Sequence, residues 1–186
     1  MEIKVPFYNI VNILLPGLVL IGSGVLLFLG EANGIAAQIS QLGSVGLEVL
    51  VTVSLLAIAY EAGYIIFRLG AVAVEPILKK MFGWADYNNF IKAGKTSEKA
   101  HDKLEMLSRE YGFARTQIML FVILITLTVA KSILAKNPLI LILTAICTGC
   151  GVLFIVTAGG QMKRTQKAVT QYLTSGTAES EDGTDG

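Results

Sequence analysis

Long runs of apolar residues dominate the pattern of this chain. Val5–Gly30 and Asn137–Met162 are two stretches of 26 residues without a single Asp, Glu, Lys or Arg. About 20 apolar residues are enough for a helix to cross the hydrocarbon core of a bilayer. We therefore expect an all-α integral membrane protein, and not a soluble enzyme, a secreted disulfide-linked domain or a nucleic-acid-binding domain.

The pattern predicts four membrane-spanning helices. They cover Ile10–Leu29, Val49–Phe67, Thr116–Leu134 and Pro138–Gly159. We expect a kink near Pro16 in the first span, because proline removes one backbone hydrogen bond of the helix. We treat this first span as uncleaved, because it is too long for the apolar region of a signal peptide and shows no clean cleavage site.

The low content of charged residues agrees with a membrane protein, and the distribution of Lys and Arg predicts its orientation in the membrane. Only 16% of the 186 residues are charged, whereas a soluble domain averages about 25%. With both termini in the cytosol, thirteen of the fifteen Lys and Arg residues lie inside, nine of them in the segment 68–115. Because positive charge accumulates in cytosolic loops, we expect a four-pass membrane protein with both ends inside.

The basic segment between spans two and three predicts helical structure at the inner membrane surface. Pro76 is expected to end span two, and the following PILKKMFGWADYNNF has the aromatic and lysine content of an amphipathic interfacial stretch. Ala93–Ser97 predicts a turn, with Thr96 or Ser97 as the N-cap of the next helix. Without an intervening proline, that helix is expected to continue from Ser97 to about Leu134.

These predictions divide the chain into four parts. A first transmembrane hairpin covers 1–67, a basic cytosolic or interfacial segment covers 68–115, and a second transmembrane hairpin covers 116–167. The remaining residues, 168–186, end in SGTAESEDGTDG. Such an acidic, apolar-poor sequence cannot bury a core, so we expect this tail to be disordered.

Three polar residues in or beside span two are candidates for an intramembrane site. Glu61 lies within the apolar segment, with Tyr64 and Arg68 following it toward the cytosol. An ionisable side chain at that depth is costly and often functional. Glu61 could bind a cation, relay a proton or hold a structural contact between helices or subunits.

Small residues four positions apart are candidates for helix packing. Ala59 and Gly63 form such a pair in span two, and Ala145 and Gly149 form another in span four. Small side chains let helices approach closely in lipid. Because four short helices enclose little space by themselves, we expect a homo-oligomer.

The cations of the basic segment are candidates for docking a cytosolic protein or anionic lipid. We expect no direct nucleic-acid contact. These residues are Lys79, Lys80, Lys92, Lys95, Lys99, Lys103 and Arg109.

Motifs of enzymes and metal sites are weak in this sequence. Cys147 and Cys150 have a spacing that redox and metal sites use, but they fall inside an apolar span, where we interpret them as packing residues. His101 is the only histidine, and we expect it to be a solvated surface residue. We therefore expect no catalytic residues, no cofactor and no metal.

Three segments carry a resemblance to a known group of proteins. They read PFYNIVNILLPG at the N-terminus, AYEAGYIIFRLG at the end of span two, and SREYGFARTQIML before span three. Together they resemble small four-span proteins encoded in bacterial anti-phage defence operons, nearest the membrane subunit of Kiwa-type systems. The resemblance implies an oligomeric inner-membrane sensor that works with a separate cytosolic effector, for which 68–115 would be the docking surface.

The expected function is thus a non-enzymatic membrane sensor that signals to a cytosolic partner. Two alternatives remain open at this stage. One is a small ion channel or transporter that uses Glu61, and the other is a membrane protein that confers immunity to a toxin.

Overall fold

The structure is a computed structural model that describes residues 7–27, 45–135 and 138–181. All regular structure in these ranges is helical, as the sequence predicts. The elements are α1 (Phe7–Leu27), α3 (Val45–Leu69), the π-helical turn η1 (Gly70–Val74), α4 (Glu75–Phe82), α5 (Tyr87–Thr96), α6 (Glu98–Ala135) and α7 (Pro138–Glu181).

Four helical segments of the described chain are long and apolar enough to cross a membrane. They are Ile10–Leu27, Glu48–Phe82, Glu98–Leu134 and Pro138–Ser175. The four predicted spans each lie on one of these helices, and Phe28 and Leu29 fall outside the described residues. Many of their apolar side chains face outward, as Leu134 does with 82% of its surface exposed. Such a surface suits lipid far better than water.

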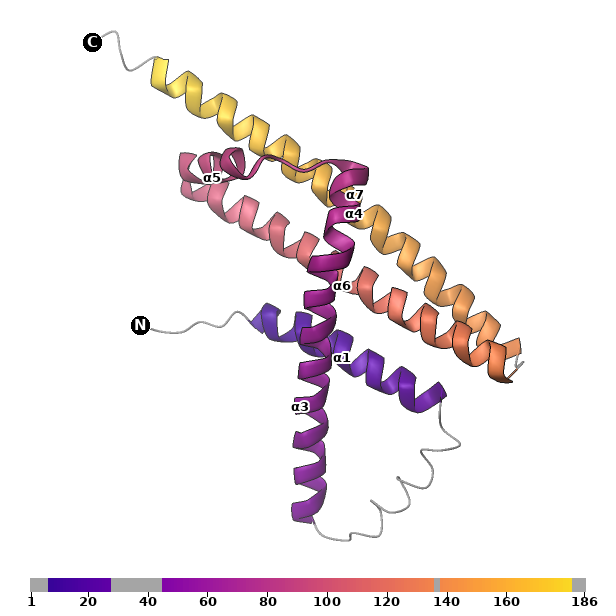
Figure 1. The fold of residues 1–186 in the computed structure, drawn as a ribbon. Coiled ribbons are helices and arrows are strands. Elements are labelled where there is room, and N and C mark those ends of the chain that lie inside the picture. Colours follow the sequence, from indigo (N-terminus) through magenta and orange to yellow (C-terminus); the bar gives the residue numbers. More distant parts are fainter. Residues whose placement is uncertain (1–6, 28–44, 136–137, 182–186) are drawn as a thin grey trace.

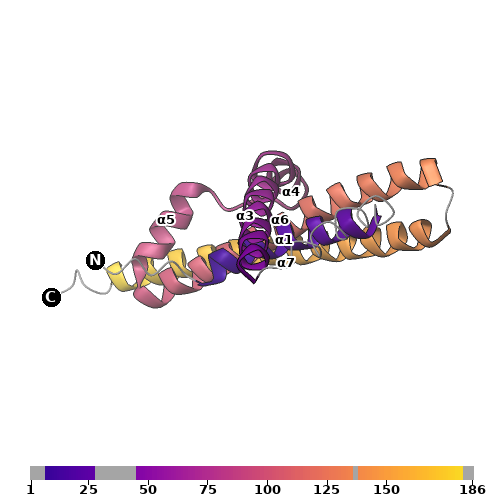
Figure 2. The same cartoon turned by 90° about the horizontal axis from the view of Figure 1, so that it is seen from below.

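The two longest helices form an antiparallel hairpin. α6 and α7 lie side by side along their lengths, with α1 next to α6 (Figures 1 and 2). The continuous rod made by α3, η1 and α4 crosses these helices steeply, and the N-terminal part of α3 projects beyond them (Figure 1). The rod contacts α1 through α3 and contacts α7 through α4.

The helix of span two does not end at Pro76. The chain stays helical from Val45 to Phe82, with the wider turn η1 just before the proline. In that turn the Glu75 N–H donates to the Gly70 carbonyl oxygen. A proline ring crowds the preceding helical turn, and we attribute the local widening of the helix to that crowding. The expected break is therefore replaced by a π-helical turn, and the helix ends at Gly83, whose φ is +73°.

Ser97 forms the corner between α5 and α6. Its Oγ accepts a hydrogen bond from the Ala100 N–H at 3.2 Å, which makes it the N-cap of α6. α6 then runs for 38 residues, about 57 Å at 1.5 Å per residue, so the single long helix is confirmed. The expected turn over Ala93–Ser97 is not seen, because α5 remains helical to Thr96 and one extended residue suffices to change direction.

The C-terminal segment is more ordered than its composition indicates. α7 continues to Glu181, so residues 168–181 are helical and not disordered, while 182–186 lie outside the described residues. Val169 is 3% exposed and packs in one cluster with Ala93 and Leu104. Contact with α5 and α6 supplies the apolar burial that the tail sequence itself lacks.

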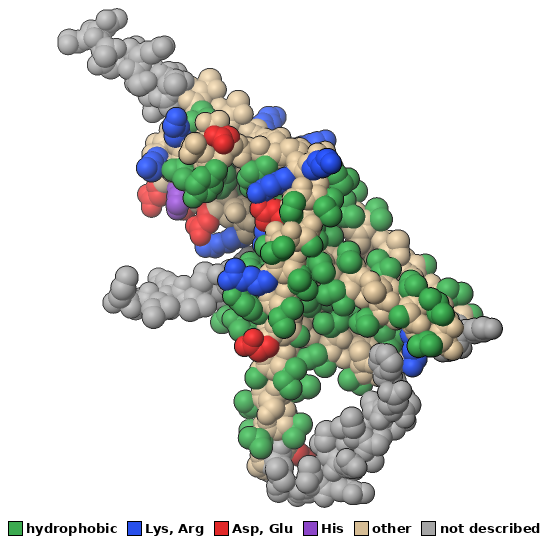
Figure 3. All heavy atoms as spheres, in the orientation of Figure 1, with side chains coloured by type: hydrophobic (Ala, Val, Ile, Leu, Met, Phe, Trp, Pro, Cys, Tyr) green, Lys and Arg blue, Asp and Glu red, His purple; other side chains and the backbone are tan. Residues whose placement is uncertain are grey.

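The main core joins the rod to the hairpin. Seven of its side chains are buried, from η1, α4, α6 and α7: Val74, Leu78, Tyr111, Ala114, Ile118, Ala158 and Met162. A second cluster lies farther along the hairpin and brings together Ile66, Leu120, Leu124 and Cys147. The charged side chains on the face shown in Figure 3 gather at the end formed by α4, α5 and the start of α6.

Candidate functional site

The three polar candidates of span two do not form one site. Arg68 donates from Nε and Nη2 to the Tyr64 hydroxyl oxygen, at 2.9 and 2.6 Å. Glu61 is exposed on α3, and no hydrogen bond or ion pair joins it to any residue that the structure describes. The tyrosine therefore holds the arginine, while the carboxylate faces the surroundings of the molecule.

The small residues of span two lie at a backbone crossing. A Cβ atom on Gly63 would overlap the carbonyl oxygen of Ile13, and one on Gly17 would overlap that of Ala59. α1 and α3 are therefore in direct backbone contact at this point. Gly17 of α1 is thus the residue that faces the Ala59 and Gly63 pair of α3. The sequence did not predict this contact.

The small residues of span four behave differently. Ala145 and Gly149 are both exposed, and open space surrounds the position of a Cβ on Gly149. They take no part in the packing of α7 against α6. Gly151 lies closer to the hairpin contact, since its Cβ position is 3.4 Å from Phe121.

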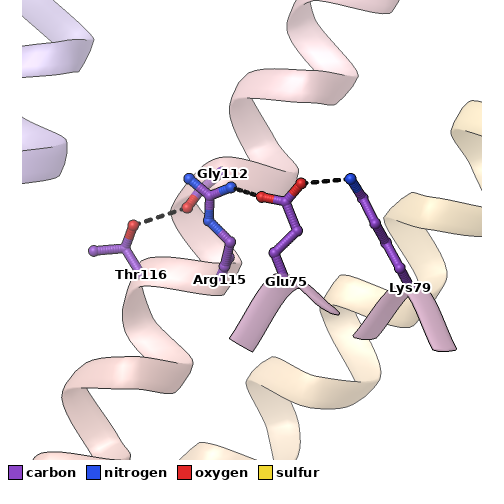
Figure 4. A network of polar contacts seen from close by, with 5 residues as sticks. All are labelled: Glu75, Lys79, Gly112, Arg115 and Thr116. Atoms are coloured by element: carbon purple, nitrogen blue, oxygen red, sulfur yellow. Dashed lines mark hydrogen bonds and ion pairs between the residues drawn. The ribbon is translucent and has the colours of Figure 1, made fainter. Parts of the chain in front are cut away.

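An ion-pair network joins α4 to α6. The Glu75 carboxylate accepts from Arg115 Nη1 through one oxygen and from Lys79 Nζ through the other, the latter at 2.7 Å (Figure 4). The Arg115 side chain is only 11% exposed. A charge removed from water to this extent requires a counter-charge, and Glu75 provides it from another helix.

Aromatic rings surround the same network. The Arg115 guanidinium lies 5.3 Å from the Phe67 ring centre and 6.0 Å from that of Tyr111. Trp84 packs on Tyr111 with ring centres 4.9 Å apart, and Lys79 Nζ is 5.7 Å from the Trp84 ring. The faces of aromatic rings attract cations, so these rings help to hold the Arg115 and Lys79 side chains in place.

A hollow of about 300 Å³ opens beside the network. Its wall includes Asn12 of α1, Phe67 of α3 and Trp84 between α4 and α5, together with Glu75, Tyr111 and Arg115. Three of these residues carry a buried polar atom without a hydrogen-bond partner, namely Asn12 Oδ1, Tyr111 Oη and Arg115 Nε. All three atoms are enclosed by the protein itself, although their residues line the hollow.

Sequence reasoning did not single out Glu75, Tyr111 or Arg115. Glu75 and Arg115 are 40 positions apart, and no local pattern pairs them. One feature of the sequence could have indicated this pairing. Both charges border long apolar stretches, where an unpaired charge is costly.

The predicted docking cations lie at the charged end but not in the hollow, except Arg109, which contributes to its wall. Lys79 pairs with Glu75 and Arg109 pairs with Glu105. The other five are exposed. They are Lys80, Lys92, Lys95, Lys99 and Lys103.

The cysteines and the histidine lie apart from the network. Cys147 is buried, Cys150 is partly buried, and both are free thiols. His101 is exposed on α6. Within the described ranges, no three His, Cys, Asp or Glu side chains gather as metal ligands.

The polar network and its hollow therefore form the candidate functional site. They lie where α1, the rod and α6 meet, between the apolar hairpin and the charged end. Comparisons of the chain with protein-family models, curated proteins and solved structures found no match.

Proposed function

We propose that this protein is a non-enzymatic, oligomeric inner-membrane subunit that senses a disturbance of the membrane and signals it to a cytosolic partner. The observation that carries the proposal is the continuity of α6, which runs from Glu98 at the charged end to Ala135 at the apolar end without interruption. The resemblance to membrane subunits of Kiwa-type systems is the reason for proposing anti-phage defence as the setting.

The length of α6 supplies a mechanical link. The helix is about 57 Å long, whereas the hydrocarbon core of a bilayer is about 30 Å thick. Since α7 runs along α6 for much of that length, the two helices form a stiff hairpin. A change in the tilt of its apolar half moves the half that carries α5.

The ion pair between Glu75 and Arg115 couples the rod to this hairpin. It lies where the apolar part of α6 gives way to the charged part, and the main core surrounds it. A movement of α3 relative to α6 is therefore transmitted through η1 and α4. The exposed lysines at the charged end favour a partner with an acidic surface.

Distance measurements between spin labels test the sensing step. In a background with Cys147→Ala and Cys150→Ala, single cysteines at Lys99, Ile133 and Val49 would carry the labels in pairs. In bilayers of increasing thickness, we expect the Lys99–Ile133 distance within α6 to stay constant and the Lys99–Val49 distance to change. If both distances are independent of bilayer thickness, the sensing proposal fails.

A photo-crosslinking amino acid tests the partner. Placed at Lys95 in cells that contain the native operon, it should capture one acidic cytosolic protein. The same amino acid at Leu153, exposed on the apolar part of α7, is the matched control and should capture none. Equal capture from both positions, or no capture from Lys95, would contradict a cytosolic partner at the charged end.

The exposed carboxylate of Glu61 favours a second candidate function, an ion channel or transporter. A carboxylate on an apolar span without a partner among the residues that the structure describes can line a path formed by several copies. Proteoliposomes should then show cation or proton flux that Glu61→Gln removes and that Glu48→Gln, at the exposed start of α3, preserves. Absence of flux in the unaltered protein would exclude this candidate.

A further inference from the structure

Two opposite charges lie on the outer face of α3 without a counter-charge. The inner face of this helix packs through Ala59, Gly63 and Ile66. Glu61 and Arg68 are exposed on the opposite face, and neither forms an ion pair with any residue that the structure describes. A charge on an apolar span is costly unless it is paired. This face therefore favours a partner that brings opposite charges to both residues.

The Arg68 guanidinium is held toward the middle of the span. Its Nε and Nη2 donate to the Tyr64 hydroxyl oxygen, at 2.9 and 2.6 Å, so the positive charge lies about one helical turn before residue 68. A hydroxyl has two lone pairs and one hydrogen. Arg68 occupies both lone pairs, and the hydrogen has no acceptor within the described ranges. Tyr64 and Arg68 together thus present a positive charge and a free O–H donor, which suit a carboxylate.

The spacing of these residues suits a second copy of the chain. Copies inserted under the same charge rule share one orientation, so their α3 helices run parallel. Between parallel helices, opposite charges at the g and e positions of coiled coils pair at an offset of roughly five residues. Tyr64 and Arg68 follow Glu61 by three and seven residues, so they bracket this offset. A neighbouring copy can therefore place its Glu61 carboxylate against both donors.

Apolar side chains on the same face fit a contact between helices. Ile58 and Ile65 are 59% and 57% exposed. Together with the two charged residues, they follow one another at steps of three and four residues. This is the spacing of the stripe along which two helices pack in a coiled coil. A second α3 would thus cover apolar surface and pair the charges at once.

We propose that α3 forms an interface between copies of this chain, in which Glu61 of one copy accepts hydrogen bonds from the Tyr64 hydroxyl and the Arg68 guanidinium of the next. The inference rests on the oligomeric part of the proposed function, and not on sensing or on a cytosolic partner. In this arrangement the carboxylate is neutralised between copies. It is then not free to bind a passing cation, which separates this assignment from the ion-path candidate.

Cysteine cross-linking in native membranes tests the contact. In a background with Cys147→Ala and Cys150→Ala, Ile65→Cys should give a covalent dimer on mild oxidation. Leu153→Cys, at a position that is 66% exposed on the apolar part of α7, is the control and should give none. Equal dimer formation from both positions, or none from Ile65→Cys, overturns the proposal.

The mass of the solubilised full chain separates this failure from a failure of the proposed function. Light scattering with the detergent contribution subtracted measures that mass. An oligomer that does not cross-link through Ile65→Cys would keep the oligomeric subunit and exclude the α3 interface. A monomer would exclude both.

Mixing two variants tests whether the charges pair between copies. Glu61→Gln and Arg68→Gln each remove every such pair when all copies carry the same change. We therefore expect association in liposomes to weaken about tenfold or more in either variant, measured by energy transfer between labelled copies at increasing lipid dilution. A mixture restores pairs, because Glu61 of one variant meets Arg68 of the other. Mixed copies should thus associate more strongly than either variant alone.

The mixing experiment distinguishes a pair between copies from a pair within one chain. A pair within one chain is absent from both variants, and mixing cannot restore it, so no gain on mixing overturns the proposal. Glu48→Gln removes another exposed carboxylate of α3 and should leave association unchanged. An equal loss from Glu48→Gln would attribute the effect to charge in general and would also overturn the proposal.

Discussion

Arg115 of α6 forms an ion pair with Glu75 of α4 across 40 positions of sequence. The pair lies where the apolar part of α6 meets the charged end, and it joins the rod to the hairpin. Lys79 forms a second ion pair with Glu75. The rings of Phe67 and Tyr111 lie near the Arg115 guanidinium. The ion pair between Arg115 and Glu75 therefore stabilises the place where α3, α4 and α6 meet.

Glu75→Gln should destabilise the protein in detergent by about 2–4 kcal/mol, because it leaves a mostly buried guanidinium without a counter-charge. Thermal unfolding followed by circular dichroism measures the effect. Glu105→Gln is the matched control, since it breaks the exposed pair with Arg109 and should cost less than about 1 kcal/mol. Equal losses for the two variants would show that the Glu75 pair does not hold the helices together.

Gly63→Ala should loosen the contact between α1 and α3. Its new Cβ would overlap the backbone of Ile13, and backbone has little freedom to move away, so we expect a loss of about 1–3 kcal/mol. Protease sensitivity of α1 and thermal unfolding both report the change. Gly149→Ala places the same methyl group in open space and should cause no loss of stability, since alanine favours a helix more than glycine does.

Val169→Asp should release the last turns of α7 from α5. A carboxylate replaces a side chain that is 3% exposed beside Ala93, and burying an unpaired charge there is strongly unfavourable. Hydrogen exchange over 165–175 should accelerate about tenfold or more. Lys167→Asp changes an exposed position of the same helix and should alter exchange far less.

The orientation predicted from charge is tested by labelling intact cells. A cysteine at Lys99 should resist a membrane-impermeant maleimide until the cells are opened, because cytosolic residues are inaccessible to it. A cysteine at Leu134, 82% exposed at the other end of α6, should react in intact cells when the outer membrane is permeabilised. The reverse pattern would place the basic segment outside the cytosol.

The sequence by itself determined the four apolar helical spans and the start of α6. Apolar runs longer than a bilayer core predict spans without any knowledge of neighbours, because the hydrocarbon is the partner. Ser97 likewise starts α6 through a hydrogen bond only three residues away. The uninterrupted helix from there to Leu134 follows from local propensity and the absence of proline.

Only the tertiary structure decided which of these helices meet and where charges pair. The partner of Gly63 is a backbone on another helix, and the partner of Glu75 is 40 positions away. The order of α7 beyond residue 168 depends on contact with α5, and composition alone predicts disorder there. Hydrogen bonds within a helix depend on residues close together in the sequence. Contacts between helices depend on how the helix faces fit together in space, and a short segment of sequence does not contain that information.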